Sequence, residues 1–511
     1  MTADPRQVRP SIRRVATLAR LAVAATAYRR AAPAAKDAAA ERLAKALAEA
    51  RGLPHKVGQV LAGSGDNAFA AALDAVPPRP FDAVMAELEA ALGCDRSVPF
   101  AWIDPVGIAA SIGQVHAARL RSGRRVAIKV RHPEVAGALA TELALLGWVP
   151  GRGPVKAFGI DLDAWRASVA DGLAEELDFA AEAEAQRTLR IGLAGLPVVV
   201  PEVVERWSTD AVLVQSWEDG EPLSAATAWT DDERADLAAT LVRAFFRSLF
   251  TVGRVHADPN PGNLAVRRAG PVAVLLDFGA TARVPADRAA TFAGLVRDLR
   301  GGTAAPALRA RLVGLGFDGD KLGEIEDLLP TYLRVLLAPL LSPGRFDLDA
   351  WPLAGVGEDV LGPGKWWFRA ASPPDALPLL RAFAGLVRQV RTLRVDLHWA
   401  SLFDAEAPAA EARAADADAD AVAALAPLPS GAATWLTIEV HEGGVRKVRA
   451  SVPARQARHL VTLMPPSAVD AAREAAVDLG AASDRAVGSG FVPQTLIDWA
   501  HGDRRWRLWL E

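Results

Sequence analysis

The sequence predicts an α+β protein in which a strand-rich segment is followed by a mainly helical one. Two apolar stretches, 115–120 and 126–130, flank a Ser-Gly pair and are typical of strands joined by a tight turn. Residues 231–402 are predicted to be mainly helical, apart from one short apolar strand at 272–276. A chain of 511 residues is long enough for about three to five domains.

The regions on either side differ from this central part. Residues 10–50 are rich in Ala, Leu, Arg and Glu and predict helix. A stretch of Ala, Asp, Glu and Pro is typical of a linker, and an alternating hairpin pattern follows it. We therefore expect a helical extension (1–97), a strand-rich lobe (98–217), a helical lobe (218–404), a linker (405–430) and a small C-terminal α+β module (431–511).

Composition excludes several classes of protein. The net charge of -3 and the pI of about 6.3 give no global basic excess, so nucleic acid is not an expected partner. The single cysteine, Cys94, excludes an intramolecular disulfide framework, a cysteine-rich zinc site and a cysteine-ligated iron–sulfur cluster. This usage suits a reducing cytoplasm.

Membrane insertion is not predicted, because no stretch reaches the roughly 20 apolar residues of a spanning helix. Residues 15–27 are apolar but are interrupted by Arg20 and flanked by arginines. This pattern favours an amphipathic helix that packs on its own protein, and the alternative is a helix lying on a membrane surface. We expect a cytoplasmic protein, with peripheral contact at the inner face of the membrane as the alternative.

Two neighbouring segments could contact nucleotide phosphates. Lys129 ends a predicted strand, where a lysine can place its charge on phosphates, although an exposed lysine would give the same pattern. Upstream, Ala109, Ala110 and Ser111 form a run of small residues that lets a turn approach phosphates closely. Alanines stand here where a protein kinase has glycines, which predicts a stiffer loop.

A second pair of segments carries the residues that phosphoryl transfer requires. Asp258 and Asn263 lie five residues apart in His-Ala-Asp-Pro-Asn-Pro-Gly-Asn, a spacing in which the Asp orients the attacking hydroxyl and the Asn ligates magnesium. Fourteen residues later, an apolar strand ends at Asp277 in Asp-Phe-Gly, which suits a magnesium ligand. Each motif is weak alone, but their order together predicts a phosphoryl-transfer site.

A kinase-like site also needs a helix carboxylate that pairs with Lys129. On a straight helix at about 100° per residue, Asp178 and Glu182 share a face, whereas Glu176 lies about 120° from Glu182. A solvated acidic face would look the same, so spacing alone leaves the partner open. The candidates are Glu175, Glu176, Asp178, Glu182 and Glu184.

Over about residues 40–400 these motifs resemble the UbiB/ADCK-type, or AarF-type, family of atypical kinases. The K-x-G-Q motif of that family matches 56–59, its alanine-rich loop matches 109–111, its E-x-D motif matches 176–178, and its H-A-D-P-x-P-G-N loop matches 256–263. Ile108 stands where another alanine is usual. The resemblance implies a bilobal protein-kinase-like fold with an N-terminal helical K-x-G-Q extension.

The resemblance also implies roles for individual residues. Lys129 would contact the phosphates of ATP and pair with Glu182, and Asp258 would be the catalytic aspartate. Asn263 and Asp277 would hold Mg²⁺. The alanine-rich loop would bind ATP, and the base would meet backbone groups near 215–219. Four residues would fold over or occlude the site: Lys56, Gln59, Glu176 and Asp178.

The implied function is that of an ATP- and Mg²⁺-dependent kinase or ATPase in isoprenoid quinone (ubiquinone) biosynthesis or lipid homeostasis. Its partners would be a nucleotide and a quinone precursor or lipid, and not a protein substrate. Because the alanine loop and the occluding motif favour low turnover, a nucleotide-binding regulatory pseudokinase is the alternative. An aminoglycoside or sugar phosphotransferase is a weaker alternative, since such enzymes lack K-x-G-Q.

Overall fold

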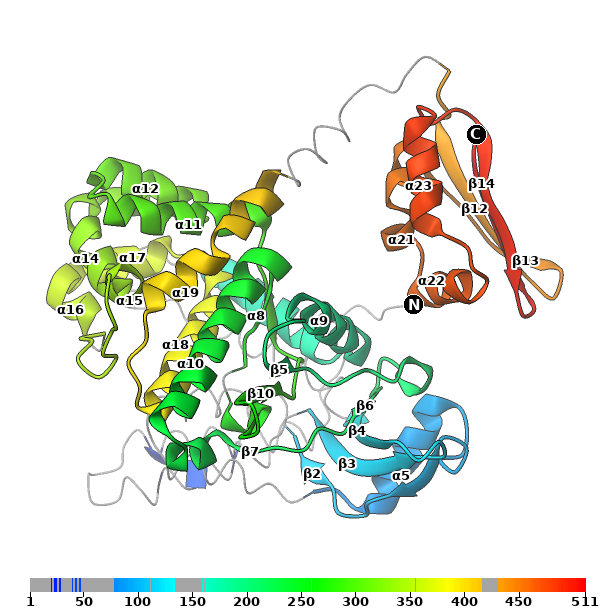
Figure 1. The fold of residues 1–511 in the computed structure, drawn as a ribbon, viewed down its shortest axis with the longest axis horizontal. Helices are drawn as coiled ribbons and strands as arrows, with labels where there is room; N and C mark the ends of the chain where they lie inside the picture. The colour runs from blue at the N-terminus through cyan, green and yellow to red at the C-terminus, as the bar shows by residue number, and fades with distance from the viewer. Residues whose placement is uncertain are drawn as a thin grey trace. The chain divides into compact units, whose positions relative to one another are not determined.

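The computed structural model describes residues 78–110, 112–133, 159, 161–258, 260–353, 355–415 and 431–511, with scattered positions between 20 and 46. The chain divides into two compact units, Met1–Ala414 and Ala415–Glu511 (Figure 1). Lys56, Gln59 and Ser111 lie outside the described residues.

A five-stranded antiparallel sheet forms the first lobe of unit 1. Its order is β1-β3-β4-β6, and β2 also pairs with β3. The predicted strands at 115–120 and 126–130 are confirmed as β3 and β4. The strands are β1 (Phe100–Ile103), β2 (Ile108–Ala109), β3 (Gly113–Leu120), β4 (Arg125–Arg131) and β6 (Val212–Ser216).

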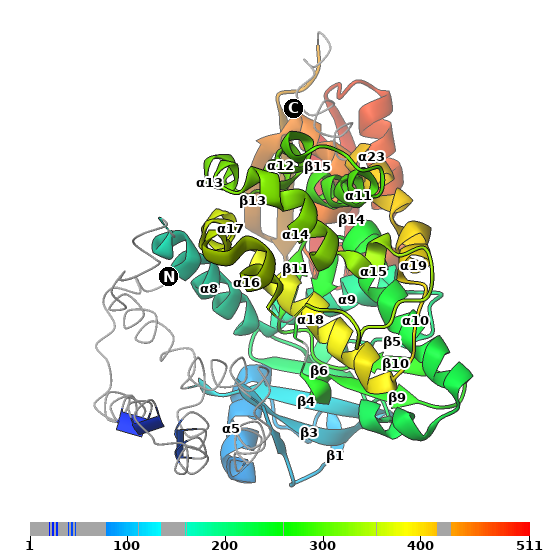
Figure 2. The same ribbon diagram turned by 90° about the vertical axis from the view of Figure 1, so that its left-hand side faces the viewer.

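Alternation along β4 gives this sheet two different faces. Val126 and Ile128 are fully buried and pack with Met85 and Leu88 of α5 (Phe81–Leu92), which lies beside the sheet in Figure 2. Burial of each such side chain stabilises the folded state by about 1.5–3 kcal/mol. Successive side chains point to opposite faces, so Lys129 lies on the other face, toward the rest of the site.

The acidic segment that carries the candidate carboxylates, treated above as one straight helix, is divided into two helices, so that expectation was wrong. The two helices are α8 (Leu162–Glu176) and α9 (Phe179–Gly192). Asp178 separates them with extended backbone (φ -101°, ψ 99°), and its carboxylate accepts hydrogen bonds from the N–H groups of Ala180 and Ala181. An N-cap residue is non-helical, so straight-helix angles between Glu176 and Glu182 do not apply.

Helices dominate the second lobe. A capping box of Thr230 and Glu233 starts α10 (Asp231–Arg247), which lies beside α18 (Ala376–Leu393) in Figure 2. The core between helices includes edge-to-face contacts of Phe403 with Phe246 and Phe250, at 5.2 and 5.3 Å between ring centroids. The other helices are α11 (Ala286–Arg300), α12 (Ala305–Gly314), α13 (Gly319–Gly323), α14 (Leu329–Leu336), α15 (Ala338–Leu341), α16 (Val356–Leu361), α17 (Lys365–Ala371) and α19 (Trp399–Glu406).

Short strands hold the two motif segments of this lobe together, and the sequence predicted only β10 (Val272–Leu275) among those after residue 231. A four-stranded sheet has the order β5-β10-β9-β7, and β8 pairs with β11. Strands of two to four residues are too short for a period to be recognised. The other strands of these two sheets are β5 (Val198–Val199), β7 (Glu221–Pro222), β8 (Arg254–His256), β9 (Leu264–Arg267) and β11 (Thr281–Arg283).

The predicted linker, 405–430, begins with helix in the structure. Residues 408–415 are helical, Ala410 is fully buried, and Arg413 Nη2 donates to the carbonyl of Val284 at 2.9 Å. Alanine favours helix strongly, so an alanine-rich composition does not distinguish a linker from a helix. Residues 416–430 lie outside the described part of the chain.

Unit 2 is an antiparallel sheet of order β13-β12-β15-β14 with helices on one face. The predicted hairpin is confirmed as β12 and β13, whereas β14 was not predicted. Trp499 and Trp506 are buried and stack at 5.0 Å, which is a packing role. The elements are β12 (Trp435–Glu442), β13 (Val445–Pro453), α21 (Leu460–Leu463), α22 (Pro466–Glu474), α23 (Leu479–Gly488), β14 (Gln494–His501) and β15 (Arg504–Leu510).

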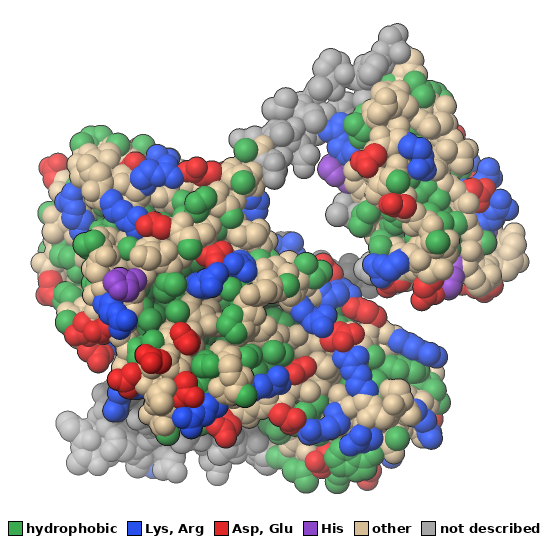
Figure 3. All heavy atoms as spheres, viewed as in Figure 1, with side chains coloured by type: hydrophobic (Ala, Val, Ile, Leu, Met, Phe, Trp, Pro, Cys, Tyr) green, Lys and Arg blue, Asp and Glu red, His purple; other side chains and the backbone are tan. Residues whose placement is uncertain are grey.

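On the face of unit 1 seen in Figure 3, basic and acidic side chains are interspersed, without a large field of one sign. Within the described part of the chain, no helix combines the length and apolar character that crossing a bilayer requires.

Candidate active site

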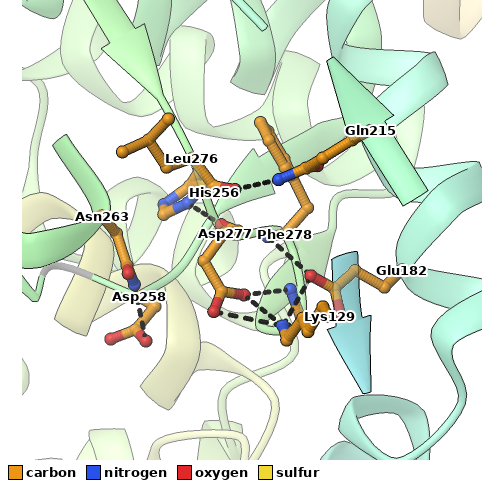
Figure 4. Close-up of polar contacts among 10 residues, drawn as sticks. Lys129, Glu182, Gln215, His256, Asp258, Asn263, Leu276, Asp277 and Phe278 are labelled. Carbon is orange, nitrogen blue, oxygen red and sulfur yellow. Dashed lines mark hydrogen bonds and ion pairs between the residues drawn. The ribbon is translucent and has the colours of Figure 1, made fainter. Parts of the chain in front are cut away.

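A buried lysine with two carboxylates forms the centre of the site. Lys129 Nζ on β4 donates to both oxygens of Glu182 on α9, at 2.8 and 2.9 Å, and to both oxygens of Asp277, at 3.2 Å each (Figure 4). The Nζ atom also lies 5.0 Å from the centroid of the Phe179 ring. We call Lys129, Glu182 and Asp277 the lysine triad.

Burial and charge shift the pKa values within the triad. Burial alone would lower the pKa of Lys129, but Asp277 and Glu182 together raise it above its usual range. Burial raises the pKa of Glu182 to about 7, with Lys129 opposing and Asp277 adding to the shift. The side chain of Glu182 is only 1% exposed, whereas that of Asp277 is 33% exposed. One cation between two carboxylates leaves a net charge of -1 when all three are ionised.

The backbone around Asp277 holds its carboxylate in place. The N–H of Gly279 donates to Asp277 Oδ1 at 2.9 Å, and the N–H of Phe278 donates to Glu182 Oε1 at 3.4 Å. A Cβ atom at Gly279 would lie 3.2 Å from Asp277 Oδ1, tighter than ordinary contact. His256 Nε2 contacts the carbonyl of Asp277, and because a carbonyl only accepts, that ring nitrogen must carry the proton.

Asp258 and Asn263 lie on the loop between β8 and β9, beside the triad. Asn263 Nδ2 donates to Asp258 Oδ2 at 2.9 Å, which leaves the amide oxygen of Asn263 outside that bond. The N–H of Leu276 donates to the carbonyl of Asn263 at 3.0 Å and joins this loop to the strand before Asp277. Phosphoryl transfer depends on such fixed positions of acidic and amide groups.

This geometry agrees with the comparison to known proteins. Residues 71–300 match the family model of the ABC1 atypical kinase-like domain. This part of the chain is an atypical kinase domain of the UbiB/ADCK family. The bilobal protein-kinase-like fold and the α+β class predicted from the sequence are thereby confirmed.

Named relatives of this atypical kinase domain come from animals and bacteria. "Atypical kinase coq-8, mitochondrial" of Caenorhabditis elegans is 31% identical over 48% of this chain and 34% of its own length. "Atypical kinase COQ8B, mitochondrial" of Rattus norvegicus is 28% identical over 72% of this chain and 71% of its own. "Uncharacterized protein slr0889" of Synechocystis is 32% identical over 48% and 65%. The chain thus spans from a third to about seven tenths of these relatives.

The other predicted residues of the atypical kinase domain are only partly assembled by the described structure. Ala109 ends β2, and the N–H of Ala110 donates to the carbonyl of Gly113 at 2.9 Å, which closes the turn of the alanine loop. Glu176 is buried at the end of α8, whereas Asp178 is exposed and caps α9. Their predicted neighbours Lys56 and Gln59, and Ser111 of the loop, lie outside the described residues.

Sequence reasoning missed two side chains at the site. Arg381 on α18 places Nη2 3.6 Å from Asp258 Oδ1. Gln215 on β6 donates from Nε2 to the carbonyl of Leu276 at 3.4 Å. Neither belongs to a motif, and each comes from an element remote in sequence from its partner. Only the packing of the elements could reveal them.

A small pocket of about 70 Å³ opens beside Asp258 in the atypical kinase domain. It lies between α10, the loop after β8 and α18, and the larger part of its wall is apolar. The lining residues are Leu241, Ala244, Phe245, Ser248, Val255, His256, Asp258, Asn260, Asn263, Leu264, Leu275, Ala382, Leu386 and Gln389.

Proposed function

We propose that this chain is an ATP- and Mg²⁺-dependent atypical kinase or ATPase of the UbiB type. It would act in isoprenoid quinone biosynthesis or lipid homeostasis and not on proteins. The observation that carries this proposal is the lysine triad, in which a buried Lys129 is held by Glu182 and Asp277. Burying charged groups is costly, and a site that buries Lys129 and Glu182 and holds the partly exposed Asp277 against them is typical of a functional site.

The residues present fit a nucleotide with its metal ion. The Asp277 carboxylate and the Asn263 amide oxygen are the hard oxygen donors that Mg²⁺ prefers, and the net charge of the triad favours a divalent cation. A magnesium ion held there would offset the negative charge of the phosphates. Lys129 would bind phosphate oxygens, and Asp258, held by Asn263, would orient the attacking hydroxyl or water.

The pocket beside Asp258 supports a small acceptor with an apolar body. Most of its lining side chains are apolar, and its polar groups include Asp258 and Asn260. A hydroxyl group carried by an apolar molecule could therefore reach the carboxylate while its body packs against α10 and α18. A phenolic quinone precursor or a lipid hydroxyl has this chemistry, and a sugar or aminoglycoside does not.

Magnesium-dependent phosphate release from ATP by the purified full chain tests the proposal. The assay is run with and without anionic liposomes and a phenolic quinone-precursor mimic. The wild type should turn over ATP, with stimulation by one of these additions, and Asp277→Asn should abolish turnover. Asp375→Asn is the matched control, because that exposed carboxylate in the second lobe pairs only with Arg288 among the ion pairs described.

Three other results would favour a different function or contradict the proposed one. Nucleotide binding without turnover under all these conditions would favour the regulatory pseudokinase. Phosphate transfer to aminoglycosides or sugars, screened in parallel, would favour the small-molecule phosphotransferase. Turnover that persists unchanged in Asp277→Asn would remove the triad from the mechanism and contradict the proposal.

A further inference from the structure

Arg381 on α18 places a positive charge beside the predicted catalytic aspartate. Its Nη2 atom lies 3.6 Å from Asp258 Oδ1. The other carboxylate oxygen, Oδ2, accepts a hydrogen bond from Asn263 Nδ2 at 2.9 Å (Figure 4). The two oxygens of Asp258 therefore face different groups, a neutral amide on one side and a guanidinium on the other.

The guanidinium of Arg381 is held loosely. Its side chain is 30% exposed, and a separation of 3.6 Å from Asp258 is longer than a hydrogen bond. Arg288 of the same lobe is similarly exposed, at 33%, but it donates to Asp375 at 2.6 Å. Arg381 can thus turn from Asp258 toward a nearby anion without breaking a hydrogen bond to that carboxylate.

The guanidinium lies where the reacting groups must meet. Ala382, Leu386 and Gln389 of the same helix line the pocket beside Asp258, so an acceptor in that pocket brings its hydroxyl close to Arg381. A hydroxyl that donates to the carboxylate lies about 2.7 Å from it. The γ-phosphorus must then come within about 3–3.5 Å of the hydroxyl oxygen to react. Its oxygens therefore come within reach of this long side chain.

The motif loop has no lysine or arginine of its own to meet these oxygens. Residues 256–263 read His-Ala-Asp-Pro-Asn-Pro-Gly-Asn. In phosphoryl transfer the negative charge spreads over the three equatorial oxygens of the transferred group, and an arginine from another segment of the same chain can stabilise it. Arg381, which lies more than 100 residues after the loop, has the charge and the position for this role.

We propose that Arg381 is a catalytic residue that binds the phosphoryl group during its transfer. The inference rests on the proposed ATP-dependent function and adds a residue to the same site. The bond from the attacking oxygen to the γ-phosphorus forms while the bond from that phosphorus to the terminal oxygen of ADP breaks. ADP leaves with the electron pair, and the proton of the attacking hydroxyl or water passes to Asp258. The guanidinium moves to the phosphoryl oxygens, where its planar fork can donate two hydrogen bonds.

Turnover and ATP affinity, measured separately on the full chain, test the proposal. Because the contact forms during transfer, Arg381→Met should lower the rate of magnesium-dependent phosphate release at least about hundredfold. Its dissociation constant for ATP should stay within about twofold of the wild type. Arg381→Lys keeps the charge without the planar fork, so it should act in the same direction and serves if the methionine variant does not fold.

Arg288→Met is the matched control, because it removes an equally exposed arginine from an ion pair in the same lobe. Both its turnover and its ATP affinity should equal those of the wild type.

Binding of ADP with aluminium fluoride, which imitates the phosphoryl group in transit, tests the contact without turnover. With Mg²⁺ present, aluminium fluoride should tighten ADP binding at least about tenfold in the wild type and in Arg288→Met. In Arg381→Met this gain should disappear, while ADP alone binds as before.

Two results would overturn the inference and leave the proposed function intact. One is turnover in Arg381→Met within about threefold of the wild type. The other is a loss of ATP affinity as large as the loss of turnover, which would place Arg381 in substrate binding and not in the transfer step. A wild type that neither turns over ATP nor binds ADP more tightly with aluminium fluoride would overturn the proposed function together with the inference.

Discussion

Lys129 and Glu182 are two opposite charges held almost entirely away from water, with side chains 8% and 1% exposed. Removing one partner leaves the other buried and uncompensated. Lys129→Met should therefore lower the free energy of unfolding by about 3–5 kcal/mol and abolish nucleotide binding. Urea denaturation and ATP titration measure the two effects.

The exposed pair of Arg124 and Glu202, also at 2.8 Å, provides the comparison for that variant. Arg124→Met should lower the free energy of unfolding by less than about 1 kcal/mol, because water screens an exposed ion pair. Adding Glu182→Gln to Lys129→Met should restore part of the lost stability. Equal losses of unfolding free energy in Lys129→Met and Arg124→Met would mean that the buried lysine pair contributes no more to stability than the exposed pair, and would contradict this prediction.

The pH dependence of stability should carry a signature of Glu182. Burial raises its pKa from 4.5 to about 7, so between these values the folded protein holds a proton that the unfolded chain has released. The contribution of Glu182 to the free energy of unfolding is therefore greatest below about pH 4.5 and is lost as the pH rises to about 7. The free energy of unfolding of the wild type minus that of Glu182→Gln should fall over this interval and then level off. A difference that rises with pH would contradict this.

At the scale of the element, α9 positions Glu182 one turn after its N-cap. Asp178 accepts two backbone N–H groups there, at 2.9 and 3.3 Å. Asp178→Ala should lower stability by about 1 kcal/mol and weaken ATP binding severalfold, because the first turn of α9 carries Glu182. Thermal unfolding and ATP titration measure the two effects.

Asp478 makes the same kind of cap on α23 of unit 2, where it accepts from the N–H of Ala481 at 2.9 Å. Asp478→Ala should cost a similar amount of stability in unit 2 and leave ATP binding unchanged. Should Asp178→Ala leave ATP affinity at the wild-type value, the cap would have no role in placing Glu182.

The elements also explain which features the sequence could predict. Strands of eight and seven residues, β3 and β4, are long enough to be recognised from the sequence, and the structure brings Lys129 of β4 next to Asp277, which follows the apolar strand β10. Strands of two or three residues such as β8 and β11 have no recognisable period, although their pairing brings His256 opposite Thr281 and so assembles the site. The break at Asp178 was missed because alanine and glutamate on both sides favour helix equally.

At the scale of the whole molecule, partners that come from separate elements could not be inferred. Arg381 meets Asp258 only because α18 packs against α10, and Gln215 meets Leu276 only because the two lobes approach each other there. No local sequence pattern predicts contacts between elements that are distant in the sequence. By contrast, the pairing of Lys129 with Glu182 was predicted, because a family resemblance carries three-dimensional information that spacing alone does not.

Each unit has its own apolar core, which predicts independent folding. The described core of unit 2 is built from residues 433–510, whereas the main core of unit 1 ends at Ala410. A chain cut after residue 415, which keeps the terminal helix of unit 1, should bind ATP within about twofold of the full chain. Residues 431–511 alone should unfold cooperatively. Loss of ATP binding on removal of unit 2 would show that the units depend on each other.

The most direct test of the central claim is the magnesium dependence of ATP binding. Calorimetric titration of the full chain with ATP should give at least about tenfold tighter binding with Mg²⁺ than with EDTA, because Asp277 and Asn263 supply oxygen ligands beside a triad with net negative charge. In Asp277→Asn this gain should disappear. ATP binding that is equally tight without Mg²⁺ in the wild type, or a full magnesium effect in the variant, would contradict the site described for this atypical kinase domain.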